Sequence, residues 1–171
     1  MKLMKVLGQE GANLVADPTN QIILRELVTA PHSISELAAQ LKLPTLNIWR
    51  RMQKLKKANI VEVTEIQKVG NLEKKFYRST ATWFTPQQYF NFSAKDTNLK
   101  QAFEIYSDIQ KSMVAKTLTF GDVPKDADPI DYSLYVNMQV FAEICGRPET
   151  QTKITKLEEA LAKFRKQSSY L

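Results

Sequence analysis

The chain has little of what metal sites and disulfides need. Among its 171 residues there is one cysteine, Cys145, and one histidine, His32. One cysteine cannot form an internal disulfide, and the two residues together cannot supply a Cys/His metal cluster within one chain. We therefore expect no metal, no cofactor and a reducing, cytoplasmic compartment. His32 stands between Pro31 and Ser33, where a polar surface histidine is a better interpretation than a general base.

Long apolar runs and catalytic loop motifs are also missing. No segment approaches the unbroken apolar length of a transmembrane helix, and Gln9-Glu10 cuts the weakly apolar N-terminus short of a signal-peptide core. There is no glycine-rich phosphate loop and no nucleophile elbow. Asp126, Asp128 and Asp131 lack the glycine and the terminal glutamate of a calcium loop. These absences predict a protein that is not an enzyme and does not enter a membrane.

Acidic residues are scarce in the first half of the chain. The net charge is +6, and residues 1–92 carry 13 Lys and Arg against 7 Asp and Glu, whereas residues 93–171 carry 11 of each. The whole positive excess therefore lies in the first half. This asymmetry indicates that one half meets a polyanion and that the other half has a different task.

The most cationic stretch, residues 44–58, has the pattern of an amphipathic helix. Ile48, Met52 and Leu55 fall on one stripe of a 3.6-residue period and should face the core. No acidic residue lies between Pro44 and Val61, although a solvated helix normally mixes charges of both signs. A basic solvent face is the alternative interpretation. We favour a helix that lies against an anionic partner.

Two further helices are expected before this one. Asp17-Pro18 is typical of a helix start, and Pro31 ends the helix that follows. Ser33 to Glu36 reads as a capping box, and that short helix ends near residues 40–42. The result is a helix, a tight turn and the helix over 44–58, which is the arrangement of a helix-turn-helix.

A β-hairpin is expected over residues 60–80. Residues 60–68 contain β-branched residues in partial alternation, residues 69–73 supply a turn, and residues 74–80 form the returning strand. Three helices followed by a basic hairpin predict a winged helix. The hairpin cations are Lys68, Lys74, Lys75 and Arg78.

Residues 14–82 resemble the ArsR-type winged helix-turn-helix regulators. The resemblance is carried by residues 16–19, 22–27, 33–38, 52–61 and 74–78. Asn20 stands where the family usually has arginine, Asn59 where it has glycine, and Trp49 where it has a small polar residue. The cysteine and histidine ligands of the metal-sensing members are absent. The resemblance implies a dimeric DNA-binding regulator without a metal switch.

The expected fold is mainly α with a small β-hairpin. We predict a winged helix-turn-helix DNA-binding domain over 1–82, an aromatic-rich connector over 83–96, and a mostly helical dimerisation or effector region over 97–171. A first helix is expected over 3–15 and a long helix over 97–118. Residues 130–145 fit either a strand or a helix, with helix slightly favoured. Whether a small effector binds the C-terminal region stays open.

The predicted function is sequence-specific binding of double-stranded DNA by a homodimer that regulates transcription. The helix over 44–58 would enter the major groove, and the hairpin over 60–80 would touch the flanking backbone or the minor groove. The alternative is a winged helix that serves as a protein-interaction module of the transcription machinery. The candidate base-reading residues are Thr45, Asn47, Trp49, Arg50 and Gln53. The candidate backbone contacts are Arg51, Lys54, Lys57, Lys68, Lys74, Lys75 and Arg78.

Overall fold

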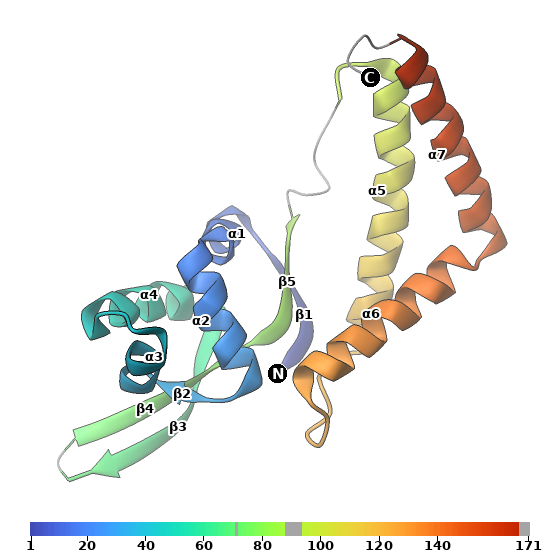
Figure 1. Cartoon of the computed structure of the whole chain (residues 1–171). Coiled ribbons are helices and arrows are strands. Elements are labelled where there is room, and N and C mark those ends of the chain that lie inside the picture. The colour runs from blue at the N-terminus through green and yellow to red at the C-terminus, as the bar shows by residue number, and fades with distance from the viewer. Residues whose placement is uncertain (71, 88–93, 168–171) are drawn as a thin grey trace. The chain divides into compact units, whose positions relative to one another are not determined.

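The computed structural model describes residues 1–70, 72–87 and 94–167 (Figure 1). The chain forms two compact units. The first contains Met1–Gln87 with Gly121–Ser133, and the second contains Gln88–Phe120 with Leu134–Leu171. In the part of the chain that the structure describes, no helix is long and apolar enough to span a bilayer.

Three helices and a hairpin build the centre of the first unit. These are α2 (Pro18–Thr29), α3 (Ile34–Leu41), α4 (Thr45–Lys57), and the strands β3 (Val61–Val69) and β4 (Leu72–Ser79). The short strand β2 (His32–Ser33) pairs with β4, so the sheet order is β2-β4-β3 and all pairs are antiparallel. This is a winged helix-turn-helix, and the predicted fold class is confirmed.

Local signals set the starts of these helices as expected. The Asp17 carboxylate accepts from the Asn20 backbone N–H at 3.0 Å and caps α2. Ser33 and Glu36 form the reciprocal capping box at the start of α3. Ile48, Met52 and Leu55 are completely buried, so α4 presents the predicted stripe to the core. Asn59 follows α4 with a φ of 55°, a left-handed conformation that asparagine tolerates.

The expected helix over 3–15 is wrong in its first half. Residues Lys2–Leu7 form strand β1, which pairs in parallel with β5 (Ala81–Pro86), and only Gln9–Ala16 are helical (α1). The Leu3 backbone N–H also donates to the Gly121 carbonyl at 3.0 Å. Leu3 and Leu7 fit a helical and an extended pattern equally well over so short a stretch. The strand forms because distant parts of the chain supply its hydrogen bonds.

The first residues of the predicted connector over 83–96 belong to strand β5. Trp83 and Phe84 belong to β5, and Phe84 packs against the core of the first unit. Tyr89, Phe90 and Phe92 lie outside the described residues.

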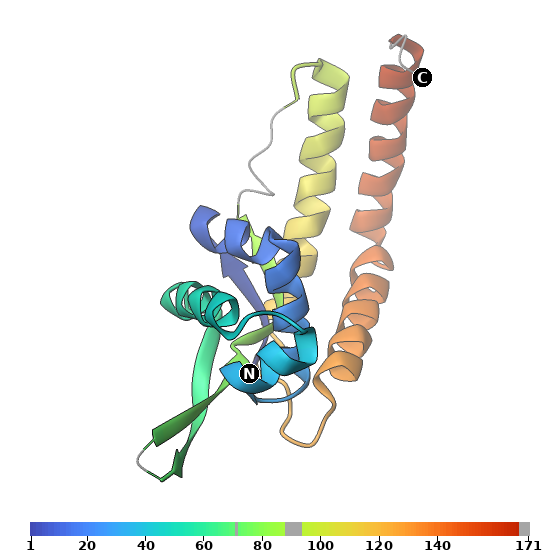
Figure 2. The ribbon, with the colours of Figure 1, turned by 60° about the vertical axis from the view of Figure 1, so that its left-hand side comes forward.

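The second unit consists of helices. α5 (Thr97–Leu118) begins at Asp96, whose side chain accepts from the Leu99 backbone N–H, and packs against α7 (Pro148–Gln167) (Figures 1 and 2). Asp108 and Lys153 form an ion pair between these helices. Residues 129–145 form helix α6 (Pro129–Cys145), so the open choice for 130–145 resolves as a helix.

Candidate nucleic-acid interface

The outward face of α4 holds the predicted base-reading residues. Thr45, Asn47, Trp49, Arg50 and Gln53 are all exposed, and 48% of the Trp49 surface is open to solvent. Lys54, Lys56 and Lys57 are exposed on the same helix. Since none of these side chains is sealed in the core, α4 offers solvent a cationic surface that contains no carboxylate of its own.

The wing, which is the hairpin of β3 and β4, lines one depression of about 440 Å³ together with α4. Thr45, Trp49 and Gln53 line it from α4, while Glu73, Lys74 and Lys75 line it from β4. Ser33, Ile34 and Ser35 close it at the start of α3. Helix α4 and the wing therefore face the same side of the first unit.

A second depression of about 440 Å³ lies on the other flank of α4. Asn47, Arg50 and Lys54 line it together with Glu10 and Asp17. The predicted base-reading residues are thus divided between the two flanks, and α4 forms a ridge between them. A ridge with polar side chains on both flanks is the shape that a major groove accepts. Two acidic side chains, Glu10 and Asp17, line this second depression, whereas Glu73 is the acidic side chain that lines the first.

Two cations of the wing, Lys74 and Lys75, already form ion pairs with acidic residues of the same chain. Lys74 Nζ donates to Glu36 Oε1 at 2.8 Å and lies 5.0 Å from the centre of the Phe76 ring. Lys75 lies 3.6 Å from Glu73, on the same strand. Lys68 is exposed and has no ion pair among the residues that the structure describes. Lys68 is therefore the wing cation most available to a phosphate.

Arg78 lies away from the tip of the wing. It is half-buried and lines a pocket of about 160 Å³ with Met1, Val123 and Lys125. Its Nε atom is buried and has no hydrogen-bond partner in the described part of the chain. The sequence placed Arg78 with the other hairpin cations, whereas the fold places it near the base of the hairpin.

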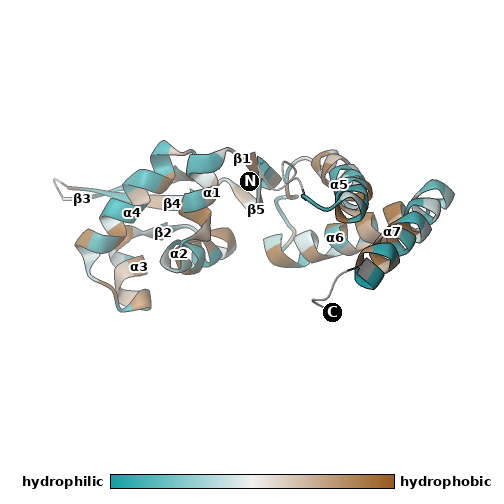
Figure 3. Cartoon of the chain, turned by 90° about the horizontal axis from the view of Figure 1, so that it is seen from above, coloured by the Kyte–Doolittle hydropathy of each residue, from teal (hydrophilic) through white to brown (hydrophobic). Residues whose placement is uncertain are grey.

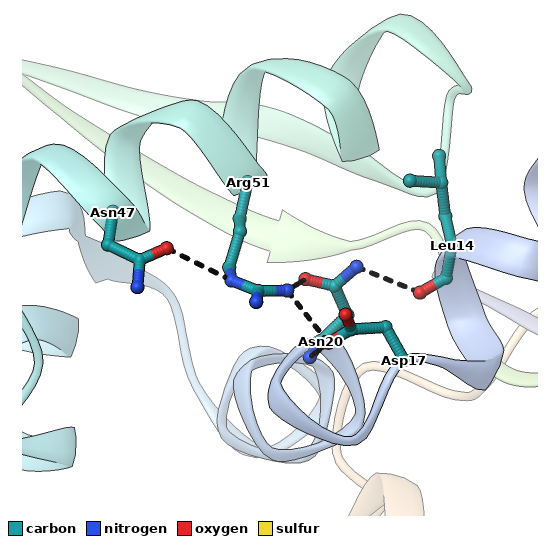
Figure 4. A network of polar contacts seen from close by, with 5 residues as sticks. All are labelled: Leu14, Asp17, Asn20, Asn47 and Arg51. Atoms are coloured by element: carbon teal, nitrogen blue, oxygen red, sulfur yellow. Dashed lines mark hydrogen bonds and ion pairs between the residues drawn. The ribbon is translucent and has the colours of Figure 1, made fainter.

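Arg51 is the centre of a polar network that joins α4 to α2 (Figure 4). Its Nη1 donates to Asp17 Oδ1 at 2.7 Å and to Asn20 Oδ1 at 3.0 Å, and its Nε donates to Asn47 Oδ1 at 3.1 Å. Asn20 is buried and donates from Nδ2 to the Leu14 carbonyl at 2.8 Å. The Asn20 backbone N–H, followed by the nearby Arg51 guanidinium, holds the pKa of Asp17 below its ordinary value. Arg51 was expected to contact phosphates, but in this structure its guanidinium binds the protein itself.

Sequence reasoning missed the structural partners of Arg51 and Lys74. Asn20 was noted as a departure from the family pattern, and the structure gives it a role as the buried acceptor for Arg51. Glu36 was read as a capping residue, and it also anchors the wing through Lys74. Each pairing joins residues more than 30 positions apart, and no local pattern signals such a contact.

The bridge between Glu36 and Lys74 gives a testable dependence on pH. The Lys74 hydrogen bond, followed by the bond from the Ser33 backbone, lowers the pKa of Glu36 from 4.5 to about 2. Because the folded pKa is lowered, the stabilisation is complete above about pH 4.5 and is lost as the pH falls toward 2. Both side chains are more than a third exposed, so screening keeps the contribution small.

We expect Glu36→Gln to lower the free energy of unfolding by about 1 kcal/mol at pH 7. Urea denaturation at several pH values measures this difference, which should shrink toward zero near pH 2. Glu73→Gln removes a looser surface pair and should change the free energy by less than about 0.5 kcal/mol. If Glu36→Gln lowered the free energy of unfolding by the same amount at pH 7 and at pH 2, the Glu36 carboxylate would not have the role assigned to it.

The similarity of this chain to known proteins lies with solved structures. No family model matches the chain, and no characterised protein matches it by sequence. Among solved structures, HlyU from Vibrio cholerae shares 21% identity over 42% of this chain and 72% of its own, with a TM-score of 0.35. The repressor BigR from Xylella fastidiosa shares 21% identity over 59% of this chain and 83% of its own, with a TM-score of 0.34.

A third similar structure is the homodimeric winged helix-turn-helix DNA-binding domain of Mb0332 from Mycobacterium bovis. It shares 13% identity over 61% of this chain and 79% of its own, with a TM-score of 0.35. Mb0332 is described as a possible ArsR-family transcriptional regulator, which is the family that residues 14–82 resemble. The winged-helix assignment of this chain rests on its own strand order, helix order and caps.

Proposed function

We propose that this protein is a transcription regulator that binds double-stranded DNA as a homodimer and reads its sequence. One observation carries the proposal: α4 is an exposed, cationic ridge without acidic residues, and the wing lines the same depression. A duplex has the matching charge and a groove of matching width for such a helix. Residues 93–171 carry no net charge, and the helices of the second unit would hold two copies together.

We assign the residues of this surface to two tasks, contact with base edges and contact with the DNA backbone. Arg50 suits guanine, Asn47 and Gln53 suit adenine, and Thr45 and Trp49 complete the set that faces base edges. Lys54, Lys57 and Lys68 are the backbone contacts whose ammonium groups are free of ion pairs in the described part of the chain. Arg51, Lys74, Lys75 and Arg78 would reach phosphate only by leaving the positions they hold here.

Binding to random duplex DNA over a range of salt concentrations tests the proposal. Three backbone contacts in each of two copies predict about six phosphates, and hence a slope of log K against log salt of roughly −5. Selection of bound sequences from a random pool should return two half-sites with two-fold symmetry, about one helical turn apart. Affinity that is absent at low salt, or indifferent to salt, would exclude this function.

A second candidate function has one specific observation in its favour. Leu46 and Trp49 expose 57% and 48% of their surface on α4, and exposed aromatic anchors are typical of protein interfaces. A winged helix of this kind could dock on another protein of the transcription machinery. Trp49→Ala separates the two functions, because a base-reading Trp49 affects only certain sequences, whereas a protein anchor leaves duplex binding unchanged.

A further inference from the structure

Helix α6 presents a row of large apolar side chains to solvent. Ile130, Leu134, Tyr135, Met138 and Phe141 expose between 40% and 64% of their surface. A different stripe of the same helix, formed by Ser133, Val136, Val140 and Ile144, is buried. Apolar segments recur along the length of α6 (Figure 3). Exposed apolar rows of this size are uncommon on monomeric proteins and mark interaction surfaces.

The exposed row has the geometry of a helix–helix seam. Ile130, Leu134, Met138 and Phe141, with the half-buried Cys145 after them, follow one another at steps of four, four, three and four residues. At 3.6 residues per turn they span about 80° of the helix circumference. The row also reads nearly the same in both directions from Met138. A second α6 in antiparallel orientation therefore brings Leu134 against Phe141, Ile130 against Cys145, and Met138 against itself.

Charge along α6 favours the antiparallel orientation of two copies. The start of the helix is acidic, since Asp128 caps the Ile130 and Asp131 backbone N–H groups and Asp131 is exposed. At the end of the helix, Glu143 pairs with both Lys116 and Arg147, which leaves one net positive charge there. Antiparallel packing places the acidic start of one helix beside the end of the other, where Arg147 lies. It also points the two helix dipoles in opposite directions, which is favourable. Parallel packing would set Asp131 against Asp131.

We propose that a second copy of this chain packs antiparallel along α6, with the two-fold axis beside Met138. The seam comprises Ile130, Leu134, Met138, Phe141 and Cys145 of both copies. This inference rests on the proposed function only for the presence of two copies, and it names the surface that joins them. An α6 of 17 residues gives a seam about 25 Å long.

Thiol crosslinking of the full chain tests the orientation. Cys145 is the only cysteine, and in an antiparallel seam the two Cys145 residues lie roughly 20 Å apart, so the unaltered chain should resist a short bis-maleimide. Ile130→Cys should crosslink in high yield through Cys145 of the second copy, and should lose that ability when combined with Cys145→Ser. Met138→Cys combined with Cys145→Ser should crosslink with itself. Crosslinking of the unaltered chain through Cys145 would indicate a parallel seam and overturn the proposal.

Mass in solution tests the surface itself. The unaltered chain should have twice the mass of one chain, and Met138→Glu or Leu134→Glu should halve it while the circular dichroism spectrum stays helical. Leu161→Glu is the matched control, because Leu161 is 42% exposed on α7 and outside the seam. A monomeric unaltered chain, or dissociation by Leu161→Glu but not by Met138→Glu, would overturn the proposal.

These measurements need no DNA, so the two proposals can fail separately. A dimer with the predicted crosslinks that binds no duplex would remove the proposed function and keep the seam. A chain that binds duplex DNA and is dimeric without α6 crosslinks would keep the function and remove the seam.

Discussion

Replacing Arg50, Lys54 and Lys57 together by alanine is expected to lower the affinity for any duplex by roughly 100-fold or more at about 0.1 M salt. All three side chains are exposed on α4, so the fold should survive. Removing Lys54 and Lys57 from both copies should also make the salt slope shallower, by about 0.9 for each phosphate that the protein no longer neutralises. Fluorescence anisotropy with a labelled random duplex, repeated over a range of salt, measures both quantities.

A matched variant separates this local effect from net charge. Lys111→Ala, Lys156→Ala and Lys163→Ala together remove the same three charges from exposed positions in the second unit. We expect that variant to bind within about threefold of the unaltered chain, because the proposal assigns none of these lysines to a phosphate. Equal losses for the two triple variants would mean that α4 has no special part in binding.

Single substitutions distinguish base reading from backbone contact. Arg50→Ala should reduce the preference for the selected site over random sequence by about 10-fold or more, since a bidentate arginine–guanine contact discriminates by about 1–3 kcal/mol. Lys68→Ala should weaken binding to all sequences alike. Lys68 suits this comparison better than Lys74, because Lys74 is bound to Glu36. Losses for Arg50→Ala that are the same on every sequence would remove it from the base-reading set.

Local signals explain why much of the winged helix could be predicted. Asp17-Pro18, the Ser33–Glu36 box and the stripe of Ile48, Met52 and Leu55 each lie within one turn or a few turns of a helix. Caps and amphipathic stripes act over three to seven residues, so the sequence displays them directly. The exposure of Trp49 and Arg50 followed from that stripe, because positions off the buried face of α4 must face outward.

Contacts between distant residues explain what could not be predicted. Strand β1 depends on β5 and on Gly121, which are far away in the chain. Arg51 and Lys74 look like any other cations of a basic stretch, and only the packing of α2, α3 and β4 supplies their carboxylate partners. A sequence shows how many charges a segment carries, whereas the fold decides which of them are already neutralised.

Arg51→Ala is expected to lower the free energy of unfolding by about 2–3 kcal/mol. The guanidinium is only 25% exposed and joins α4 to Asp17 and to Asn20, which is itself only 3% exposed. Its removal leaves the Asn20 Oδ1 atom without a donor in a place that water reaches poorly. Urea denaturation measures the loss of stability, and Lys57→Ala, on the exposed face of the same helix, should cost less than about 0.5 kcal/mol.

A double-mutant cycle ties this loss of stability to the network. Arg51→Ala and Asn20→Ala should together cost less than the sum of the two, with a coupling of about 1 kcal/mol, because they share one hydrogen bond. The same variant decides between the two roles considered for Arg51. If Arg51 holds α4 in place, Arg51→Ala lowers stability and leaves the salt slope of duplex binding unchanged in the folded protein. If Arg51 also contacts phosphate, the slope becomes shallower as well, and the network of Figure 4 would then open on DNA.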